Sequence, residues 1–137
     1  MLSTEELKKY VNNEIRIKLG NVCSDKLFFE EGTDNSIEGT YIFNKNNEYH
    51  ILYIEKGKIR NDILTDDKRE VLWHVVQMIS VEIIMNYAMH NREKGKDFRR
   101  AFFAKEIEVF SLFGEDFKKR KKEEIKIILQ NNPFNDV

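Results

Sequence analysis

Apolar side chains recur every four residues near the start of the chain, at Leu7, Val11, Ile15 and Leu19. This spacing places them on one face of a helix. Ser3 followed by Glu6 fits a capping box, and Gly20 stands where a glycine commonly ends a helix. The first element is therefore predicted to be an amphipathic helix.

Residues 21–38 show no clear hydrophobic period. Their only apolar run is residues 27–29, Leu-Phe-Phe, inside an otherwise acidic stretch. Two interpretations stay open for this run, a brief strand or a loop anchored on the core.

Residues 40–65 carry the pattern of a three-stranded antiparallel meander. Residues 40–43 are β-branched or aromatic, and residues 44–47 are turn formers. Residues 48–55 alternate, so one face holds Tyr49, Ile51 and Tyr53, and the other holds His50, Leu52 and Ile54. After a turn at Lys56-Gly57, the more polar residues 58–64 suit an edge strand.

A long helix is predicted from Asp66 or Asp67 to about Asn91, because acidic residues suit a helix N-terminus. Its apolar residues lie nearly all round, which is typical of a central helix. They are Val71, Leu72, Val75, Val76, Ile79, Ile83, Met85 and Met89.

Two further helices follow. Asp97 is the predicted cap of the first, which ends at Gly114, and the second runs from about Glu115 to Asn131, where Pro133 stops it. A helix, a small sheet and then three helices predict an α+β fold. The length of 137 residues and the absence of an internal repeat predict one domain, residues 1–137.

Composition and charge narrow the class of protein. The net charge of −1 gives no argument for nucleic acid as a partner, but residues 25–38 carry five acidic side chains against one lysine. A single cysteine, Cys23, allows no intrachain disulfide and favours a reducing compartment. The first residues lack a signal-peptide pattern, and residues 71–89 contain polar side chains that lipid would disfavour. We therefore expect a cytoplasmic protein without a membrane partner.

No arrangement of residues indicates catalysis, a metal or a cofactor. His50, His74 and His90 lack the spacing of metal ligands, and Cys23 has no neighbour in the sequence that would activate its thiol as a nucleophile. The glycines are isolated, so no phosphate-binding loop is expected.

Two charged features of the sequence are candidates for a functional role. Glu82 lies within the apolar helix, where a buried carboxylate needs a cation, and Arg99 or Arg100 is the expected partner in an internal ion pair. An active-site acid is the less favoured alternative because no partner base is visible. The basic run 118–122 is interpreted as a solvated helix face, with nucleic-acid binding as the alternative.

A set of ordered short motifs resembles the immunity protein 63 family of bacterial polymorphic toxin systems. The most specific are the residues Asp97-Phe98-Arg99-Arg100, Phe103-Ala104-Lys105, Glu108, Glu124-Ile125, Ile128-Leu129 and Asn132-Pro133-Phe134-Asn135-Asp136. Upstream, Tyr49-His50, Glu55 with Gly57, Thr65-Asp66 and Tyr87 before Arg92 and Gly95 also look like the family pattern. Phe117 departs from it, since a Trp is expected there.

The resemblance implies a cytoplasmic antidote that binds a cognate toxin domain, with a nuclease as one candidate for its activity. Acidic side chains would complement a basic toxin cleft. The predicted toxin-binding residues are therefore Glu30, Glu31, Asp34, Glu38, Tyr49 and Tyr53, although core packing weighs equally for the two tyrosines. The predicted structural motif residues are Glu82, Asp97, Arg99, Arg100, Pro133 and Phe134.

Two other classes of function stay open at this point. One is a small nucleic-acid-binding or regulatory module that uses the basic run 118–122. The other is a small enzyme that uses Glu82 or Cys23.

Overall fold

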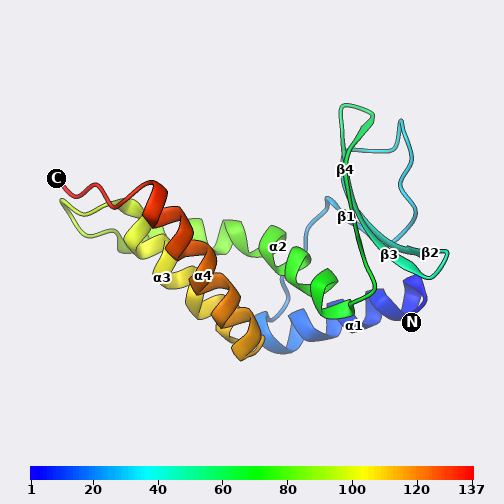
Figure 1. Cartoon of the computed structure of the whole chain (residues 1–137), viewed down its shortest axis with the longest axis horizontal. Coiled ribbons are helices and arrows are strands. Elements are labelled where there is room, and N and C mark those ends of the chain that lie inside the picture. The colour runs from blue at the N-terminus through cyan, green and yellow to red at the C-terminus, as the bar shows by residue number, and fades with distance from the viewer. The chain divides into compact units, whose positions relative to one another are not determined.

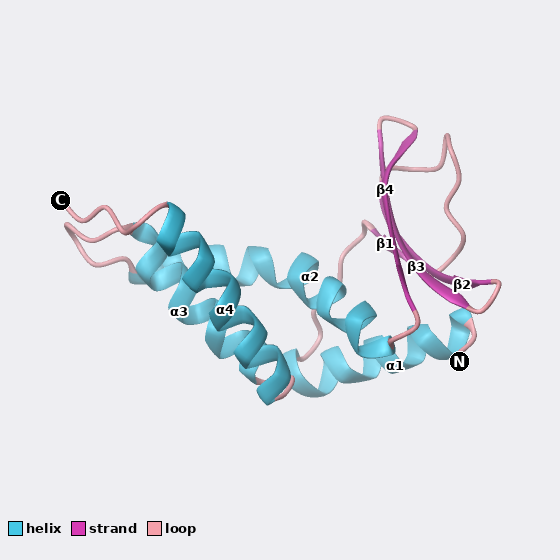
Figure 2. Cartoon of the chain, in the orientation of Figure 1, coloured by secondary structure: helices cyan, strands magenta, loops and turns pink.

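The computed structural model describes all residues from 1 to 137, and its elements follow the predicted α+β order (Figure 1). They are α1 (Thr4–Leu19), β1 (Leu27–Phe28), β2 (Gly39–Lys45), β3 (Glu48–Glu55), β4 (Lys58–Thr65), α2 (Lys68–Asn91), α3 (Phe98–Ser111) and α4 (Glu115–Asn131). All strands lie within residues 27–65, between α1 and α2 in the chain, and are drawn in magenta in Figure 2.

The chain divides into two compact units, Met1–Gln77 and Met78–Val137. The boundary falls inside α2. The first unit contains α1, the sheet and the start of α2, and the second contains the remainder of α2 with α3 and α4. Folding of residues 1–137 as a single domain stays a prediction.

Helix α1 has the predicted capping box. Ser3 Oγ accepts from the Glu6 N–H at 3.1 Å, and Glu6 Oε1 accepts from the Ser3 N–H at 2.9 Å. Leu7, Val11 and Ile15 form its buried face. Capping satisfies backbone donors that a helix N-terminus otherwise leaves unpaired.

The sheet has four strands in the order β1-β2-β3-β4, so the predicted number of three was wrong, and the sheet is mixed because of the added strand β1, one of the two interpretations left open for residues 27–29. The β2–β3–β4 meander is antiparallel as expected, but β1 pairs with β2 in parallel. Strand β1 has only two residues, too few to show a period of two, and its direction is set by the loop that joins it to β2.

One face of the sheet is covered by residues 29–38, which we call the acidic loop. On this face Tyr41, Phe43, Leu52 and Ile54 form a buried cluster, with Phe28 packed against it. The Phe28 and Tyr41 rings stack at 4.9 Å between centroids, and the Tyr41 hydroxyl donates to Ile37 O at 2.6 Å. The loop is therefore part of the packing of the first unit.

Gly32 is the point of closest approach between the acidic loop and the sheet. A Cβ at this position would lie 2.7 Å from Tyr41 Cγ and 2.9 Å from Leu52 Cδ2. Both distances are shorter than carbon–carbon contact allows, so only glycine fits.

The other face of the sheet contacts the N-terminal segment. The Tyr49 hydroxyl accepts from the Leu2 N–H at 2.7 Å, and Asn44 Nδ2 donates to Leu2 O at 2.7 Å. The Asn44 N–H also donates to Thr4 Oγ1 at 2.9 Å. Both faces of the paired strands β2 and β3 are thus covered within the first unit.

Helix α2 begins and ends close to the predicted residues, and Asp67 Oδ1 accepts from the Arg69 N–H at 2.8 Å. Val71, Leu72, Val75 and Val76 are almost completely buried, as expected for a central helix. The expected burial was wrong towards the C-terminal end of α2, where the side chain of Met85 is 40% exposed and that of Met89 is 67% exposed.

In the second unit, α3 and α4 are joined at Gly114 and carry aromatic residues on their buried sides. The Phe113 and Phe117 rings stack at 5.8 Å, and Phe110 contacts Phe117 at 6.4 Å. These ring contacts pack the end of α3 against the start of α4.

We expect Gly32→Ala to lower the free energy of unfolding by about 1–3 kcal/mol, because the new methyl group overlaps Tyr41 and Leu52. Glu30→Ala, on the same loop but exposed, is the matched control and should change it little. Urea unfolding measures both. Equal midpoints for Gly32→Ala and the unsubstituted protein would show that the loop does not pack as described.

Candidate functional site

The acidic loop is attached to the turn between β3 and β4. Three hydrogen bonds make this attachment: the Ile59 N–H donates to Asp34 Oδ1 at 3.2 Å, the Asn35 N–H donates to Gly57 O at 2.8 Å, and the Lys56 N–H donates to Glu38 Oε1 at 3.4 Å. Two of the four predicted toxin-binding carboxylates, those of Asp34 and Glu38, therefore also hold the loop in shape.

The charges of the acidic loop are only partly neutralised. Glu31 forms an ion pair with Lys45, and Glu38 Oε2 lies 3.5 Å from Lys26 Nζ. All four side chains are about half exposed, so these pairs contribute little stability. Glu30 is exposed and has no ion-pair partner. A negative surface remains on the outer side of the loop.

Tyr53 and Ile37 are among the exposed apolar or aromatic side chains in the same unit as these carboxylates. Tyr53 is 39% exposed, and its hydroxyl donates to Glu55 Oε2 at 3.1 Å. This hydrogen bond to a carboxylate, followed by partial desolvation, raises the pKa of Tyr53 above its ordinary value, so the phenol stays neutral. Ile37, which the sequence did not single out, is 75% exposed on the acidic loop.

Tyr49 is a core residue, so its prediction as a toxin contact was wrong. Its side chain is 2% exposed, and its hydroxyl is engaged by the Leu2 N–H. Alternation correctly placed Tyr49 with Ile51 on one face of β3, but that face is buried. Of the two tyrosines predicted as toxin contacts, only Tyr53 is accessible.

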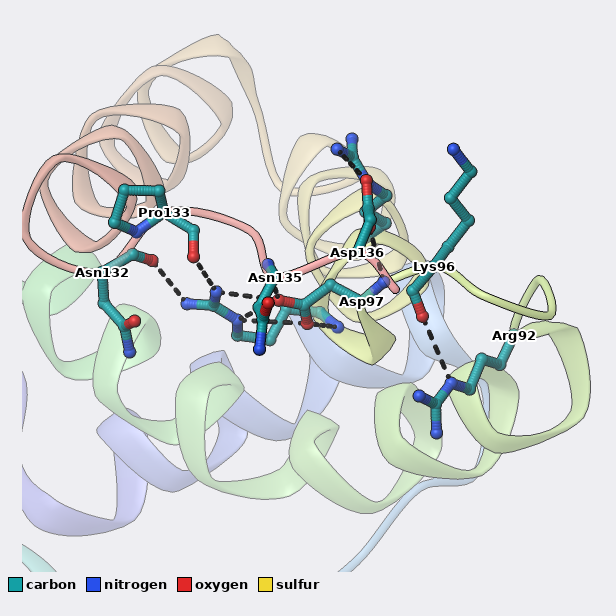
Figure 3. A network of polar contacts seen from close by, with 9 residues as sticks. Arg92, Lys96, Asp97, Asn132, Pro133, Asn135 and Asp136 are labelled. Carbon is teal, nitrogen blue, oxygen red and sulfur yellow. Dashed lines mark hydrogen bonds and ion pairs between the residues drawn. The ribbon is translucent and has the colours of Figure 1, made fainter.

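A polar network in the second unit attaches the C-terminal tail to the start of α3 (Figure 3). Asp97 is the N-cap of α3 and accepts from the Arg99 N–H at 2.9 Å, from Arg99 Nη2 at 2.9 Å and from the Asn135 N–H at 2.8 Å. Arg99 in turn donates to the carbonyls of Asn132 and Pro133 at 2.9 and 2.8 Å. Hydrogen bonds from Arg99 and Asn135 hold the pKa of Asp97 far below its ordinary value.

The second half of the network centres on Asp136. Arg100 binds this carboxylate in a bidentate manner, through Nε at 3.0 Å and Nη2 at 2.8 Å, and the Asp97 N–H donates to it at 2.7 Å. These donors, Arg100 first, lower the pKa of Asp136 from 3.8 to about 2. The Arg100 guanidinium also lies 4.1 Å from the centre of the Phe134 ring. Arg99, Arg100, Pro133 and Phe134 thus contact one another in a structural tie.

Glu82 takes no part in that tie, and the predicted ion pair with Arg99 or Arg100 was wrong. Glu82 is exposed, and the arginines pair with Asp97 and Asp136 instead. Asp97 at the start of α3 and Asp136 in the tail lie within ion-pair distance of the arginines, whereas Glu82 lies in the middle of α2.

The basic run 118–122 is not a uniform solvated face, because Lys121 is 2% exposed. Its ammonium lies 2.9 Å from Glu124 Oε2, 3.5 Å from Glu106 Oε2 and 4.3 Å from the centre of the Phe110 ring. Burial raises the pKa of Glu106, and the charge of Lys121 opposes that shift. Lys121 is therefore unavailable to a phosphate, which weakens the nucleic-acid interpretation.

The structure adds observations on a metal site, on the cysteine and on a membrane span. No group of three or more His, Cys, Asp or Glu side chains is arranged to hold a metal ion, and Cys23 is exposed. Helix α2 is long and apolar enough to cross a membrane, but half of its most apolar window is buried inside the protein. Core helices pass the same test, so this is weak evidence for a membrane span.

The depressed pKa values in the tail network predict acid sensitivity. Because the folded-state pKa of Asp136 lies below its ordinary 3.8, its stabilisation is complete above about pH 4 and is lost as the pH falls towards 2. We expect Asp136→Asn to unfold at a lower temperature than the unsubstituted protein at pH 7, with the gap closing by pH 2. Circular dichroism melts measure this, with Asp25→Asn, an exposed carboxylate without an ion-pair partner, as the control. A gap that is constant with pH would refute the role of the Asp136 charge.

Comparison with protein families gives one match, to the family described as immunity protein 63, over residues 45–127. The matched stretch is more than half of the chain and includes β3, β4, α2, α3 and most of α4. It leaves out the acidic loop and the tail with Pro133 and Phe134. Neither the comparison with curated proteins nor that with solved structures gives a match. The chain belongs to the immunity protein 63 family.

Proposed function

We propose that the protein neutralises one cognate toxin domain by binding it, without catalysis. The observation that carries the proposal is the family match over residues 45–127, since membership implies toxin neutralisation in general. A stoichiometric inhibitor needs a stable surface of defined shape and charge, and no catalytic apparatus.

The acidic loop is the surface that we propose for toxin contact. It presents Glu30, Glu31, Asp34 and Glu38 beside the exposed side chain of Ile37. The hydrogen bonds at Asp34, Asn35 and Glu38 hold its backbone in place before any partner arrives. A preformed surface binds more tightly because less conformational entropy is lost on association.

The charge of this surface favours a partner with a basic cleft. Toxins that act on nucleic acid need such a cleft, and carboxylates steer towards it and occupy its phosphate-binding positions. We therefore propose a nuclease domain as the cognate toxin. Tyr53 adds a neutral phenol at the end of β3, where amphipathic side chains commonly anchor interfaces.

The proposed site of action is the cytoplasm, where an intracellular toxin meets its target. The exposed thiol of Cys23 suits a reducing compartment, because an exposed free cysteine is open to disulfide exchange elsewhere.

Co-expression with the toxin encoded beside this protein tests the function. We expect cells to survive with the intact protein and to die without it. If the toxin kills the cells equally with and without the protein, the proposed function is refuted, whichever surface was proposed for the contact.

The contact surface is tested by reversing its charge. Glu30→Lys combined with Glu31→Lys should slow association with the toxin about tenfold or more at low salt, with a smaller difference at high salt, because steering is screened. Glu115→Lys with Glu123→Lys on α4 makes the same change of charge in the other unit and is the matched control. Stopped-flow or surface-based kinetics measure the rates. Equal slowing by both pairs would mean that only net charge matters and that the acidic loop is not the contact surface.

A further inference from the structure

Strand β4 leaves one edge of the sheet open. It is the last strand in the order β1-β2-β3-β4, and all eight of its residues are at least partly exposed. The opposite edge, β1, has only two residues. An edge strand carries unpaired backbone N–H and C=O groups, whose complement is another extended chain.

The first half of β4 is closed to such pairing. Asp34 already accepts from the Ile59 N–H, and the register shifts at a bulge where Arg60 has no partner on β3. Lys58 and Arg60 add charge to this half. Bulges and charged side chains are the usual means by which an edge avoids pairing.

The rest of the strand, residues 61–65, has no bulge and no hydrogen bond to the acidic loop, and its one charged side chain, Asp62, is paired with His50. Its register with β3 places Asp62 and Leu64 on one face, and Asn61, Ile63 and Thr65 on the other. Leu64 is 50% exposed, and Asp62 is held by His50 at 3.0 Å across the β3–β4 pair. This part of β4 is in regular register with β3 and partly apolar.

We propose that residues 61–65 pair antiparallel with the same residues of a second copy, about a two-fold axis at Ile63. This register places Ile63 opposite its own copy, Asp62 opposite Leu64, and Asn61 opposite Thr65. Facing side chains then lie on matching faces, as a ladder requires. Just outside the ladder, Arg60 of each copy faces Asp66 of the other, so the flanking charges are opposite at both ends.

Neighbouring registers lack this complementarity. An axis at Asp62 would place the two Asp62 carboxylates opposite each other and bring the bulge at Arg60 into the ladder. An axis at Leu64 would place Asp62 opposite Asp66, again with like charges. Like charges directly opposite one another destabilise a strand pair. The charge pattern of β4 therefore favours a second copy in one register.

The proposed dimer is weak, because five paired residues bury less surface than a standard interface. Its ladder leaves the acidic loop and the Asp34–Ile59 hydrogen bond outside the contact. It does not depend on the proposed toxin.

Charge exchange tests the register with the full chain. Arg60→Asp alone places acids at all four flanking positions, and Asp66→Arg alone places arginines there. Each variant alone should be monomeric where the unsubstituted protein dimerises. An equimolar mixture of the two variants should dimerise again, because each end then pairs an acid with an arginine. Sedimentation velocity from about 10 μM to about 1 mM covers the range expected for a small interface.

Circular dichroism of each variant establishes that loss of the dimer is not loss of the fold, since Arg60 Nε also donates to Glu55 O at 3.3 Å. A monomer at every concentration of the unsubstituted protein would overturn the proposal. So would a dimer that the single substitutions leave intact. If the protein is monomeric and Leu64→Lys abolishes toxin binding, the edge binds the toxin instead of a second copy.

Discussion

The close packing of Gly32 against Tyr41 and Leu52 of the sheet determines which surface the first unit presents. With no side chain at this position, the acidic loop lies directly on Tyr41 and Leu52, and the cluster beneath it is sealed from water. The same contact turns Glu30 and Glu31 outward on a backbone that is already held at Asp34 and Glu38. Burial of the core and display of charge are therefore consequences of one packing contact.

Each unit contains an irregular segment that a few strong hydrogen bonds attach to the rest of that unit. In the first unit the ties run from the acidic loop to the β3–β4 turn, and in the second they run from the tail to the start of α3 (Figure 3). They differ in exposure. The side chain of Asp97 is 12% exposed and its partners are all within the protein, whereas the outer carboxylates of the acidic loop have at most one surface lysine. The tail network is suited to stability, whereas the loop displays the charge on which the proposed toxin contact rests.

Local chemistry allowed most elements to be predicted from the sequence. The capping box at Ser3, the alternation in β3 and the cap at Asp97 each depend on neighbours within a few residues, and the structure confirms them. Features that depend on distant residues were missed. The parallel pairing of β1, the burial of Tyr49 under Leu2 and the pairing of Arg100 with Asp136 join residues that are far apart in sequence. A period of two places Tyr49 on a face but does not say what covers that face. The family resemblance was confirmed over residues 45–127, and the proposed contact residues of the acidic loop lie before that stretch.

Amide hydrogen exchange of the protein, alone and saturated with its toxin domain, tests the central claim most directly. If the acidic loop is the contact surface, exchange at residues 29–38 slows markedly in the complex, because their exposed amides become shielded. Unchanged exchange at residues 29–38, together with protection confined to other segments, would contradict the claim and place the toxin elsewhere on the molecule.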